Sequence, residues 1–326
     1  MLRARPCASV SLDLDDLWTY LKIHGDPEWT ARPSYLPDFL PLALDTLARL
    51  GVRITFFVVG FDATVPGNRD VLREITRRGH EVGNHSFEHD SWLYQWDRNR
   101  LAAELSRTET ALAEVCGQRP LGFRGPGFSW SPALLELLKE RGYLYDASTL
   151  PTWIGPLARA YYFRSTRLSP EQRAQRKALF GRWGDGLRPV GPYHWHFPDG
   201  GTLLEIPVTT IPVIKVPFHL SYLLYLAGYS EGLMERYFRV ALGWCRLWRV
   251  TPSFLLHPLD LLGGDLVPGL RFFPGMQLPT QRKLRLFERV LRMLGDRFTI
   301  VPMSVQALEL SERGRLAFET PSLSVT

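Results

Sequence analysis

The chain has 326 residues, of which 45% are hydrophobic and 22% charged, and its formal net charge is +6. This composition is typical of a folded protein with one large domain or two modest ones, and it excludes an intrinsically disordered chain. Three scattered cysteines predict no disulfide framework, and the absence of about 20 consecutive apolar residues argues against a transmembrane helix. The N-terminal stretch MLRARPCASVSLDLDD contains no apolar run of signal-peptide length, so we expect a soluble, cytoplasmic protein.

Short apolar runs alternate with helical stretches along the first half of the chain. In chain order we expect strands at 8–14, 52–60, 80–85, 120–125 and 143–148, and helices at 35–51, 68–79, 97–117 and 131–142. Further strands are expected at 203–208, 253–258 and 298–303, with a helix at about 281–294. Strands and helices repeated with short links favour a parallel α/β sheet or barrel.

Two segments interrupt this alternation. Residues 153–195 are irregular, basic and aromatic, which indicates an insertion. Between Arg159 and Arg188 there are eight basic residues against two acidic ones, a local net charge of +6 that equals the charge of the whole chain. The insertion could be a solvated surface segment, or it could attract phosphate, anionic lipid or nucleic acid.

Residues 211–250 form the second interruption and are rich in Leu, Tyr, Trp and Phe. The apolar runs are short and broken by charged residues, so a pair of helices that pack on the core is the first interpretation. A face that lies on a membrane surface, with aromatic and arginine side chains at the interface, is the alternative.

The stretch GHEVGNHSFEHD, residues 79–90, carries three histidines and three carboxylates. His85 and His89 are four residues apart and could share a helix face without any function. Polar residues also follow the other predicted strands, where ligands of parallel α/β folds are commonly found. These strand-end residues are Asp15 and Asp16, Arg124 to Gly127, Asp146, and His257. With His85 they make five strand-end positions. Each has an ordinary structural explanation, but five together favour one site.

The residue types fit the chemistry of a hydrolytic metal centre. One carboxylate and two imidazoles leave positions on a divalent ion open for water and substrate. A second carboxylate could accept a proton from water, and Arg124 could keep that carboxylate ionised. A histidine could protonate a leaving nitrogen, and the backbone amide of Gly127 could stabilise a developing oxyanion.

The sequence resembles the polysaccharide deacetylase family, the NodB-homology or carbohydrate esterase 4 type. The family's Asp-Asp pair matches LDLDD, its His-[Ser/Thr]-x-x-His motif matches HSFEH, its Arg-x-Pro motif matches Arg124 to Pro126, and its Leu-x-His motif matches LLHP. The resemblance covers roughly residues 8–150 and 200–310 and implies a distorted (β/α) barrel of about seven parallel strands. The insertion and the aromatic segment are not explained by it.

The resemblance also implies residue roles. Asp15 would be the general base, with Asp16, His85 and His89 as metal ligands, His257 as the general acid, Arg124 as the residue that orients Asp15, and Gly127 as an oxyanion donor. The chain departs from the family where YDASTLPTW lacks a second aspartate, so Asp146 and Asp260 are rival partners of His257. Leu17 also replaces the usual glycine after the aspartate pair.

The leading hypothesis is therefore a single deacetylase-like domain, residues 1–326, that holds one divalent metal ion. Zinc is expected, with cobalt, nickel, iron or manganese as alternatives. The reaction would remove an acetyl or formyl group from the nitrogen of an amino sugar, including a lipid-linked or glycolipid precursor at an anionic inner membrane surface. A cytosolic ureide or formamide amidohydrolase and a catalytically inactive carbohydrate-binding relative remain the alternatives, and no nucleic-acid partner is expected. The metal interpretation requires Asp16 to lie beside the two imidazoles, at a place that solvent can reach.

Overall fold

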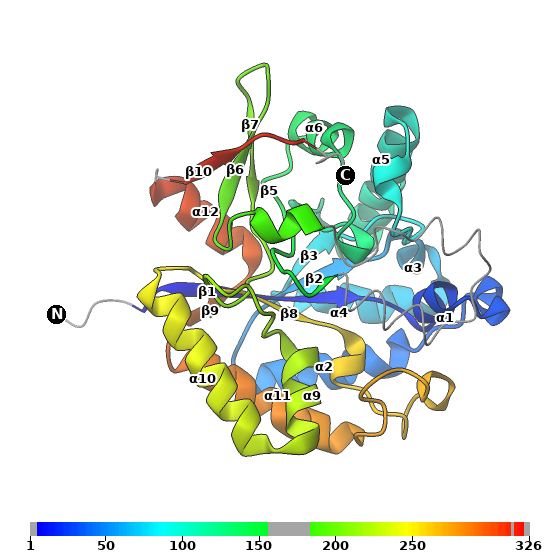
Figure 1. Ribbon diagram of the computed structural model, residues 1–326. Helices are drawn as coiled ribbons and strands as arrows, with labels where there is room; N and C mark the ends of the chain where they lie inside the picture. Colours follow the sequence, from blue (N-terminus) through cyan, green and yellow to red (C-terminus); the bar gives the residue numbers. More distant parts are fainter. Residues whose placement is uncertain (1–4, 156–182, 314–315, 323–326) are drawn as a thin grey trace.

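A curved, mostly parallel sheet with helices on its outer sides forms the molecule (Figure 1). The computed structural model describes residues 5–155, 183–313 and 316–322. The strands are β1 (Cys7–Leu14), β2 (Thr55–Val58), β3 (Glu81–Asn84), β4 (Gly122–Phe123), β5 (Tyr145–Asp146), β6 (Tyr193–His196), β7 (Thr202–Glu205), β8 (Ser253–Leu256), β9 (Thr299–Val301) and β10 (Ala317–Glu319).

The strand order is β10-β6-β7-β5-β4-β3-β2-β1-β8, and β9 also pairs with β1. Seven neighbouring strands, from β8 through β1 to β5 and β7, pair in parallel, and among the described strands only the β6–β7 pair is antiparallel. Beyond β7, Thr209 donates its backbone N–H to the carbonyl of Ser253 at 3.0 Å, and the Ser253 N–H donates to Thr209 Oγ1 at 2.8 Å. These bonds link the β7 side of the sheet to β8, and the expected parallel α/β architecture is confirmed.

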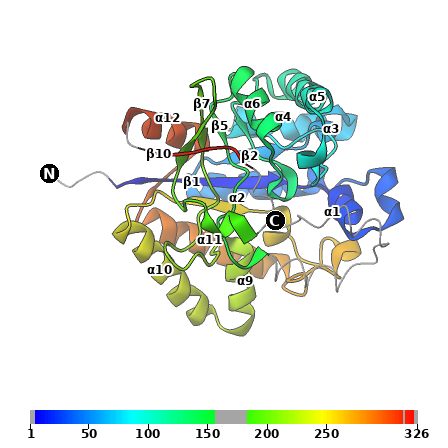
Figure 2. The ribbon, with the colours of Figure 1, turned by 45° about the horizontal axis from the view of Figure 1, so that its top comes forward.

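Ten α-helices are described, most of them packed outside the sheet. They are α1 (Leu17–His24), α2 (Leu36–Leu50), α3 (Gly60–Thr64), α4 (Arg69–Arg77), α5 (Arg98–Cys116), α6 (Pro132–Glu140), α9 (Leu220–Tyr229), α10 (Glu231–Leu247), α11 (Thr280–Gly295) and α12 (Met303–Arg313). In Figures 1 and 2, α9, α10 and α11 lie on one side of the sheet and α5 and α6 on the other. The helices expected at 35–51, 68–79, 97–117, 131–142 and 281–294 are all present.

The helix ends follow local chemistry. Gly51 adopts a left-handed conformation, φ 66°, and its N–H closes α2 on the carbonyls of Leu47 and Ala48. Ser131 begins α6 by accepting a hydrogen bond from the N–H of Leu134. Both residues were expected as helix boundaries, because glycine relieves the steric strain of a left-handed end and serine satisfies a free N–H at a helix start.

The structure describes one of the two interrupting segments completely and the other only in part. Residues 156–182, which hold seven of the eight basic residues of the insertion, lie outside the described residues. Residues 211–250 contain α9 and α10, which pack against each other, and the expected helix pair is confirmed. Within the described ranges, every helix is too short or too polar to cross a bilayer.

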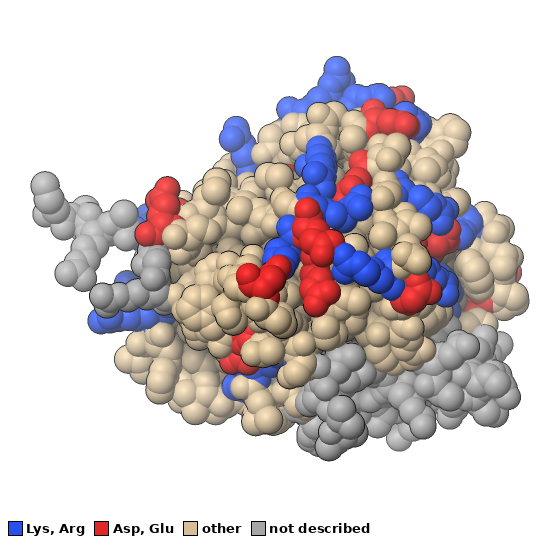
Figure 3. Space-filling model, turned by 90° about the horizontal axis from the view of Figure 1, so that it is seen from above, with Lys and Arg blue, Asp and Glu red and all other residues tan. Residues whose placement is uncertain are grey.

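Charged side chains on the face seen from above do not gather by sign. Blue and red groups alternate over this face in Figure 3. Arg98 on α5 pairs with Glu136 on α6 at 3.5 Å, and Arg141, just after α6, pairs with Glu109 on α5 at 2.6 Å. Pairs of this kind partly cancel each other's charge.

Candidate metal centre

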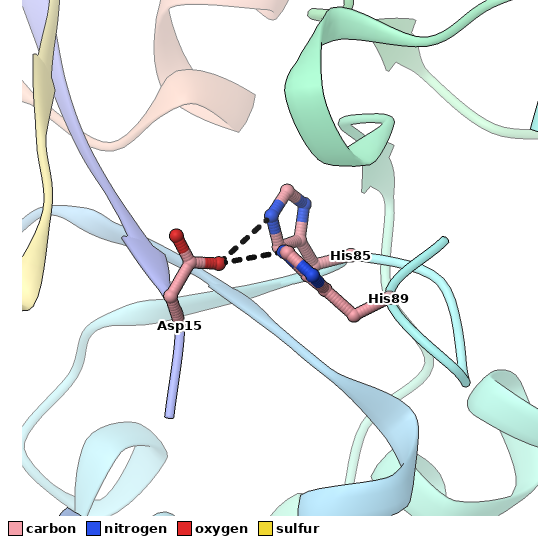
Figure 4. Close-up of side chains that lie close together, drawn as sticks. All are labelled: Asp15, His85 and His89. Atoms are coloured by element: carbon pink, nitrogen blue, oxygen red, sulfur yellow. Dashed lines mark ion pairs between the residues drawn. The ribbon is translucent and has the colours of Figure 1, made fainter. Parts of the chain in front are cut away.

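Three side chains converge at the carboxyl ends of β1 and β3. Asp15 directly follows β1, and His85 directly follows β3, with His89 four residues later (Figure 4). Asp15 Oδ1 lies 2.8 Å from His89 Nε2 and 3.5 Å from His85 Nε2. One carboxylate and two imidazoles are thus within 4.8 Å of one another, all buried.

The two imidazoles are held by the loop that follows β3. His85 Nδ1 lies 2.7 Å from the carbonyl of Arg124, so Nδ1 donates and Nε2 is left as the ligand atom. On α5, the Glu104 carboxylate accepts the N–H groups of Phe87 and Glu88 at 2.8 and 2.7 Å, which fixes the loop between the histidines. His89 has a positive φ of 51°, so this fixed loop also holds a backbone conformation that histidine rarely adopts.

Asp16 is not part of this cluster, and its prediction as the third metal ligand is wrong. Its Oδ1 accepts the backbone N–H groups of Leu17 at 2.7 Å and Tyr35 at 2.9 Å, so the side chain caps α1. Burial raises the pKa of Asp16 to about 6, which its hydrogen bonds only partly offset. Asp15 fills the place expected of Asp16, and the carboxylate–imidazole cluster is retained.

Arg124 contacts a different aspartate from the one expected. Its Nη1 donates to Asp13 Oδ1 at 2.6 Å and to Ser11 Oγ at 2.8 Å, and its Nε donates to the carbonyl of Ala147 at 3.0 Å. The guanidinium is fully buried. The prediction that Arg124 orients Asp15 is therefore wrong, and the arginine-held carboxylate is Asp13.

Asp13 was missed although the sequence carries its signal. In ASVSLDLD the polar residues Ser9, Ser11, Asp13 and Asp15 alternate with apolar ones. Successive side chains of a strand point to opposite faces, so Asp13 and Asp15 share a face. Two adjacent aspartates, such as Asp15 and Asp16, would point to opposite faces. The apolar partners Val10, Leu12 and Leu14 pack in the hydrophobic core instead.

His257 follows β8 and is the third histidine of the region. Its N–H donates to Asp260 Oδ2 at 2.9 Å, and the same oxygen lies 3.8 Å from Nδ1 of the ring. Burial alone would lower the pKa of His257, but Asp260, with smaller contributions from Asp13 and Asp15, raises it to about 9. The side chain is 28% exposed, so it can meet a substrate from solvent.

Asp260, not Asp146, is therefore the carboxylate beside His257. Asp146 ends β5, opposite Glu205 on β7, and accepts a hydrogen bond from Ser148 Oγ at 2.6 Å. Burial and the charge of Glu205 raise its pKa well above the ordinary value. Asp146 belongs to a buried carboxylate pair between neighbouring strands, and its prediction as the partner of His257 is wrong.

Two further residues lie near the cluster. His219 begins α9, its ring centroid is 6.3 Å from that of His257, and burial lowers its pKa to about 3, so it stays neutral. No role was predicted for it, because a lone histidine in an aromatic segment carries no spacing signal. Gly127 has a φ of 61° in the turn after Arg124, and its oxyanion role stays a prediction. Next to it, Gly125 admits no side chain, because a Cβ would lie 1.9 Å from the carbonyl oxygen of Ser129.

The donor set fits a divalent metal ion. Asp15 Oδ1 is buried and approaches both imidazoles without hydrogen-bond geometry, and His89 Nδ1 also makes no hydrogen bond within the described residues. Burial would raise the pKa of Asp15, but His89 and His85 outweigh it and hold the pKa well below its ordinary value. An ionised carboxylate and two imidazoles suit zinc and the later first-row metals.

These features define a parallel α/β barrel protein with a candidate metal centre at the carboxyl ends of its strands. The model of the polysaccharide deacetylase family matches residues 3–145, so this part of the chain is similar to that family. The matched segment includes β1, the His85–His89 loop and Arg124, but it ends before His257.

Curated relatives match the same part of the chain. A peptidoglycan-N-acetylglucosamine deacetylase of Bacillus cereus is 32% identical over 108 residues, which are 33% of this chain and 48% of the relative. A chitin deacetylase of Arthroderma benhamiae is 28% identical over 114 residues, 34% of this chain and 30% of the relative. The matches thus span about a third to a half of the length of these relatives.

Solved structures extend the likeness of the fold to the whole chain. A candidate polysaccharide deacetylase from Mycobacterium smegmatis superposes with a TM-score of 0.63 at 20% identity, covering 100% of this chain and 96% of that one. The allantoinase PuuE superposes with a TM-score of 0.57 at 16% identity, covering 95% and 92%. At these identities the likeness concerns the fold alone.

Proposed function

We propose that this protein is a metal-dependent hydrolase that removes an N-acyl group, acetyl or formyl, from an amino sugar. The observation that carries the proposal is the Asp15–His85–His89 cluster, which lies near an arginine-held aspartate and an aspartate-paired histidine. Relatives named as deacetylases of N-acetylglucosamine in peptidoglycan and of chitin support the substrate class.

Asp15, His85 and His89 would hold the metal ion. When bound, the ion would polarise the acyl carbonyl and increase the acidity of water. Zinc is our proposal for the metal, because two imidazoles and one carboxylate match its common catalytic ligand set.

The remaining residues provide acid–base chemistry. Asp13, fixed by Arg124, would accept the proton of the attacking water. His257, protonated because of Asp260, would donate a proton to the leaving nitrogen and release the free amine. This arrangement would put a base and an acid beside the same cluster, and Gly127 remains the proposed oxyanion donor.

The test is release of acetate or formate from a panel of N-acylated sugars, with the purified protein loaded with zinc, cobalt or nickel. Allantoin and a simple formamide serve as competing substrates. Hydrolysis of amino sugars alone supports the proposal, whereas hydrolysis of the ureide alone would replace it. A protein that hydrolyses nothing and retains no metal after dialysis would be a catalytically inactive relative.

We further propose a lipid-linked sugar as the substrate, taken from an anionic membrane surface on the cytoplasmic side. The support lies on α10, where Leu233, Val240 and Leu247 are exposed at intervals of seven residues and so form one stripe. Leu247 is 75% exposed, and the exposed Arg246 is its neighbour. Apolar side chains with arginine between them suit the interface of an anionic bilayer.

The position of α9 relates this stripe to the candidate centre. His219, beside His257, begins α9, while Tyr225 and Tyr229 further along the helix are 63% and 73% exposed. At about 1.5 Å per residue, ten residues of helix span roughly 15 Å. A sugar head group could therefore reach the centre while its lipid stays near α9 and α10.

Sedimentation with vesicles tests the membrane proposal. The protein should sediment with phosphatidylglycerol vesicles at low salt, and Leu247→Glu should weaken binding at least about fivefold. The matched control is Leu308→Glu, which changes an exposed leucine on α12, 55% exposed, away from the stripe. Equal losses in the two variants, or no binding at low salt, would rule out this surface.

A further inference from the structure

A buried lysine lies beneath the turn that carries Asp260. Lys283 on α11 is 1% exposed, and its Nζ donates to the carbonyls of Leu259 at 2.6 Å and Leu262 at 2.7 Å. A third contact, at 3.6 Å, joins Nζ to the sulfur of Met276. The two carbonyls come from either side of Asp260, so one ammonium group holds both arms of the turn.

The turn in question fixes the carboxylate beside His257. The 3₁₀ turn Pro258–Asp260 is closed by the Asp260 N–H, which donates to the carbonyl of His257 at 2.9 Å. In return, the His257 N–H donates to Asp260 Oδ2. Any movement of Leu259 or Leu262 would therefore alter the position of the carboxylate relative to the imidazole.

The buried charge of Lys283 also ties this side chain to the turn. Burial lowers its pKa to about 8, while the carboxylates of Asp260 and Asp265 act in the opposite direction. Burying an ammonium group is costly unless its donors are satisfied, and here two backbone carbonyls satisfy them. The arrangement stabilises this one turn, which a hydrophobic side chain at the same position could not do.

We propose that Lys283 is a positioning residue that, through the turn at Leu259 and Leu262, holds Asp260 against His257 and so keeps His257 protonated. The catalytic meaning of this inference rests on the proposed function, because it assumes that His257 acts as the general acid. The geometry itself does not depend on the substrate.

The experiment is a double-mutant cycle of Lys283→Met and Asp260→Asn, read by NMR titration of the His257 ring. The groups that act on this ring are Asp260, Asp13, Asp15 and His219. Lys283→Met should lower the pKa of His257 by about one unit, and it should add little to Asp260→Asn, since both act through the same carboxylate. An unchanged pKa, or fully additive shifts, would overturn the proposal.

Lys215→Met is the matched control. Lys215 also donates to two backbone carbonyls, those of Gly186 at 2.6 Å and Arg188 at 2.8 Å, but at a different turn. The pKa of His257 should be unchanged in this variant. If Lys283→Met does not fold, Lys283→Gln takes its place. Because glutamine keeps two N–H donors for these carbonyls, the pKa of His257 should stay near its wild-type value in this variant, and a pKa lowered by a full unit would overturn the proposal.

Kinetics separate this inference from the proposed function. With an N-acylated sugar, Lys283→Met should leave kcat at pH 7 within about twofold, because a ring with a pKa of about 8 is still protonated there. Above pH 9 it should lower kcat up to about tenfold, and KM should stay within about twofold, because binding groups are untouched. If the wild-type protein hydrolyses no such sugar, the proposed function fails, while the titration still decides the role of Lys283. A raised KM with a kcat that stays normal across this pH range would contradict a positioning role.

Discussion

At the scale of single residues, the assignment of three neighbouring aspartates decides how the centre works. Asp13 lies against Arg124, Asp15 lies against two imidazoles, and Asp16 caps a helix. The side-chain alternation of a strand produces this division, because it separates residues 13 and 15 from residue 16. Three carboxylates within four positions therefore have three different environments.

The first prediction distinguishes these aspartates by substitution. Asp13→Asn should lower turnover about 10³-fold and keep the metal, because it removes a proton acceptor without removing a ligand. Asp15→Asn should lose both the metal and turnover. Metal analysis and kcat with an N-acylated sugar measure the two effects.

Asp16→Asn is the control for this pair. It should keep its metal and most of its activity, and it should lose about 1 kcal/mol of stability or less, since asparagine also caps helices. A metal-free Asp16→Asn protein together with a metal-loaded Asp15→Asn protein would reverse the assignment.

The second prediction concerns the pH dependence that His257 imposes. Its raised pKa, about 9, means that the ring is protonated below this value and able to donate, and that it loses its proton as the pH rises through about 9. A bound cation repels the imidazolium, so the alkaline limb of activity should fall at or below pH 9.

Asp260→Asn should move this limb down by about one unit or more, because it removes the main charge that favours the protonated ring. The measurement is kcat/KM against pH for both proteins. A limb that stays in place would show that His257 is not the acid that limits the rate.

At the scale of elements, α5 fixes the loop that presents both imidazoles. Glu104 receives two successive N–H groups of that loop, and it is itself buried, with a pKa raised chiefly by burial. Removing the carboxylate would leave both N–H groups without this acceptor and loosen the path between His85 and His89.

The third prediction is that Glu104→Ala weakens metal affinity about 10- to 100-fold, as loss of outer contacts to ligands commonly does. Calorimetric titration with zinc measures the affinity. Glu114→Ala, at an exposed position of the same helix, is the matched control and should bind zinc normally. Equal affinity in the two variants would mean that the loop holds its shape without α5.

The elements were largely predictable from the sequence, because each carries a local signal. Gly51 and Ser131 mark helix ends, and the apolar run of β2 marks a buried strand. Shorter elements such as α1 and β6 were not predicted, because few residues carry their pattern and tertiary contacts stabilise them.

Most residues of the candidate site could be predicted from the sequence, but the contacts between them could not. His85, His89, Arg124 and His257 were all placed near the centre from their positions after strands. Which carboxylate each of them meets depends on the strand face and on loop paths: Asp13 for Arg124, Asp260 for His257. The motif match assigned roles to the adjacent pair Asp15 and Asp16 without considering that side chains alternate along β1. No pattern in the sequence connects Lys283 with Asp260.

At the scale of the whole molecule, the candidate centre joins distant parts of the chain. Its ligands follow β1 and β3, which β2 separates in the sheet, and its proposed acid follows β8 on the other side of β1. A metal ion bound here would connect the loops after β1 and β3, and would bind the folded chain far better than the unfolded one.

The fourth prediction follows from that linkage. Zinc at about 1,000 times its dissociation constant stabilises the folded state by about 4 kcal/mol. For a chain of this length that corresponds to roughly 6 °C in Tm, taking the average entropy of unfolding per residue. Chelation should remove this increment in wild-type protein.

Asp15→Asn should unfold at one temperature with or without zinc, because a ligand is missing. Asp13→Asn should keep the full increment, because Asp13 contacts Arg124 and not the imidazoles. Scanning calorimetry of the three proteins measures these shifts without any substrate. An Asp15→Asn protein that zinc still stabilises fully would remove Asp15 from the ligand set, independently of the proposed activity.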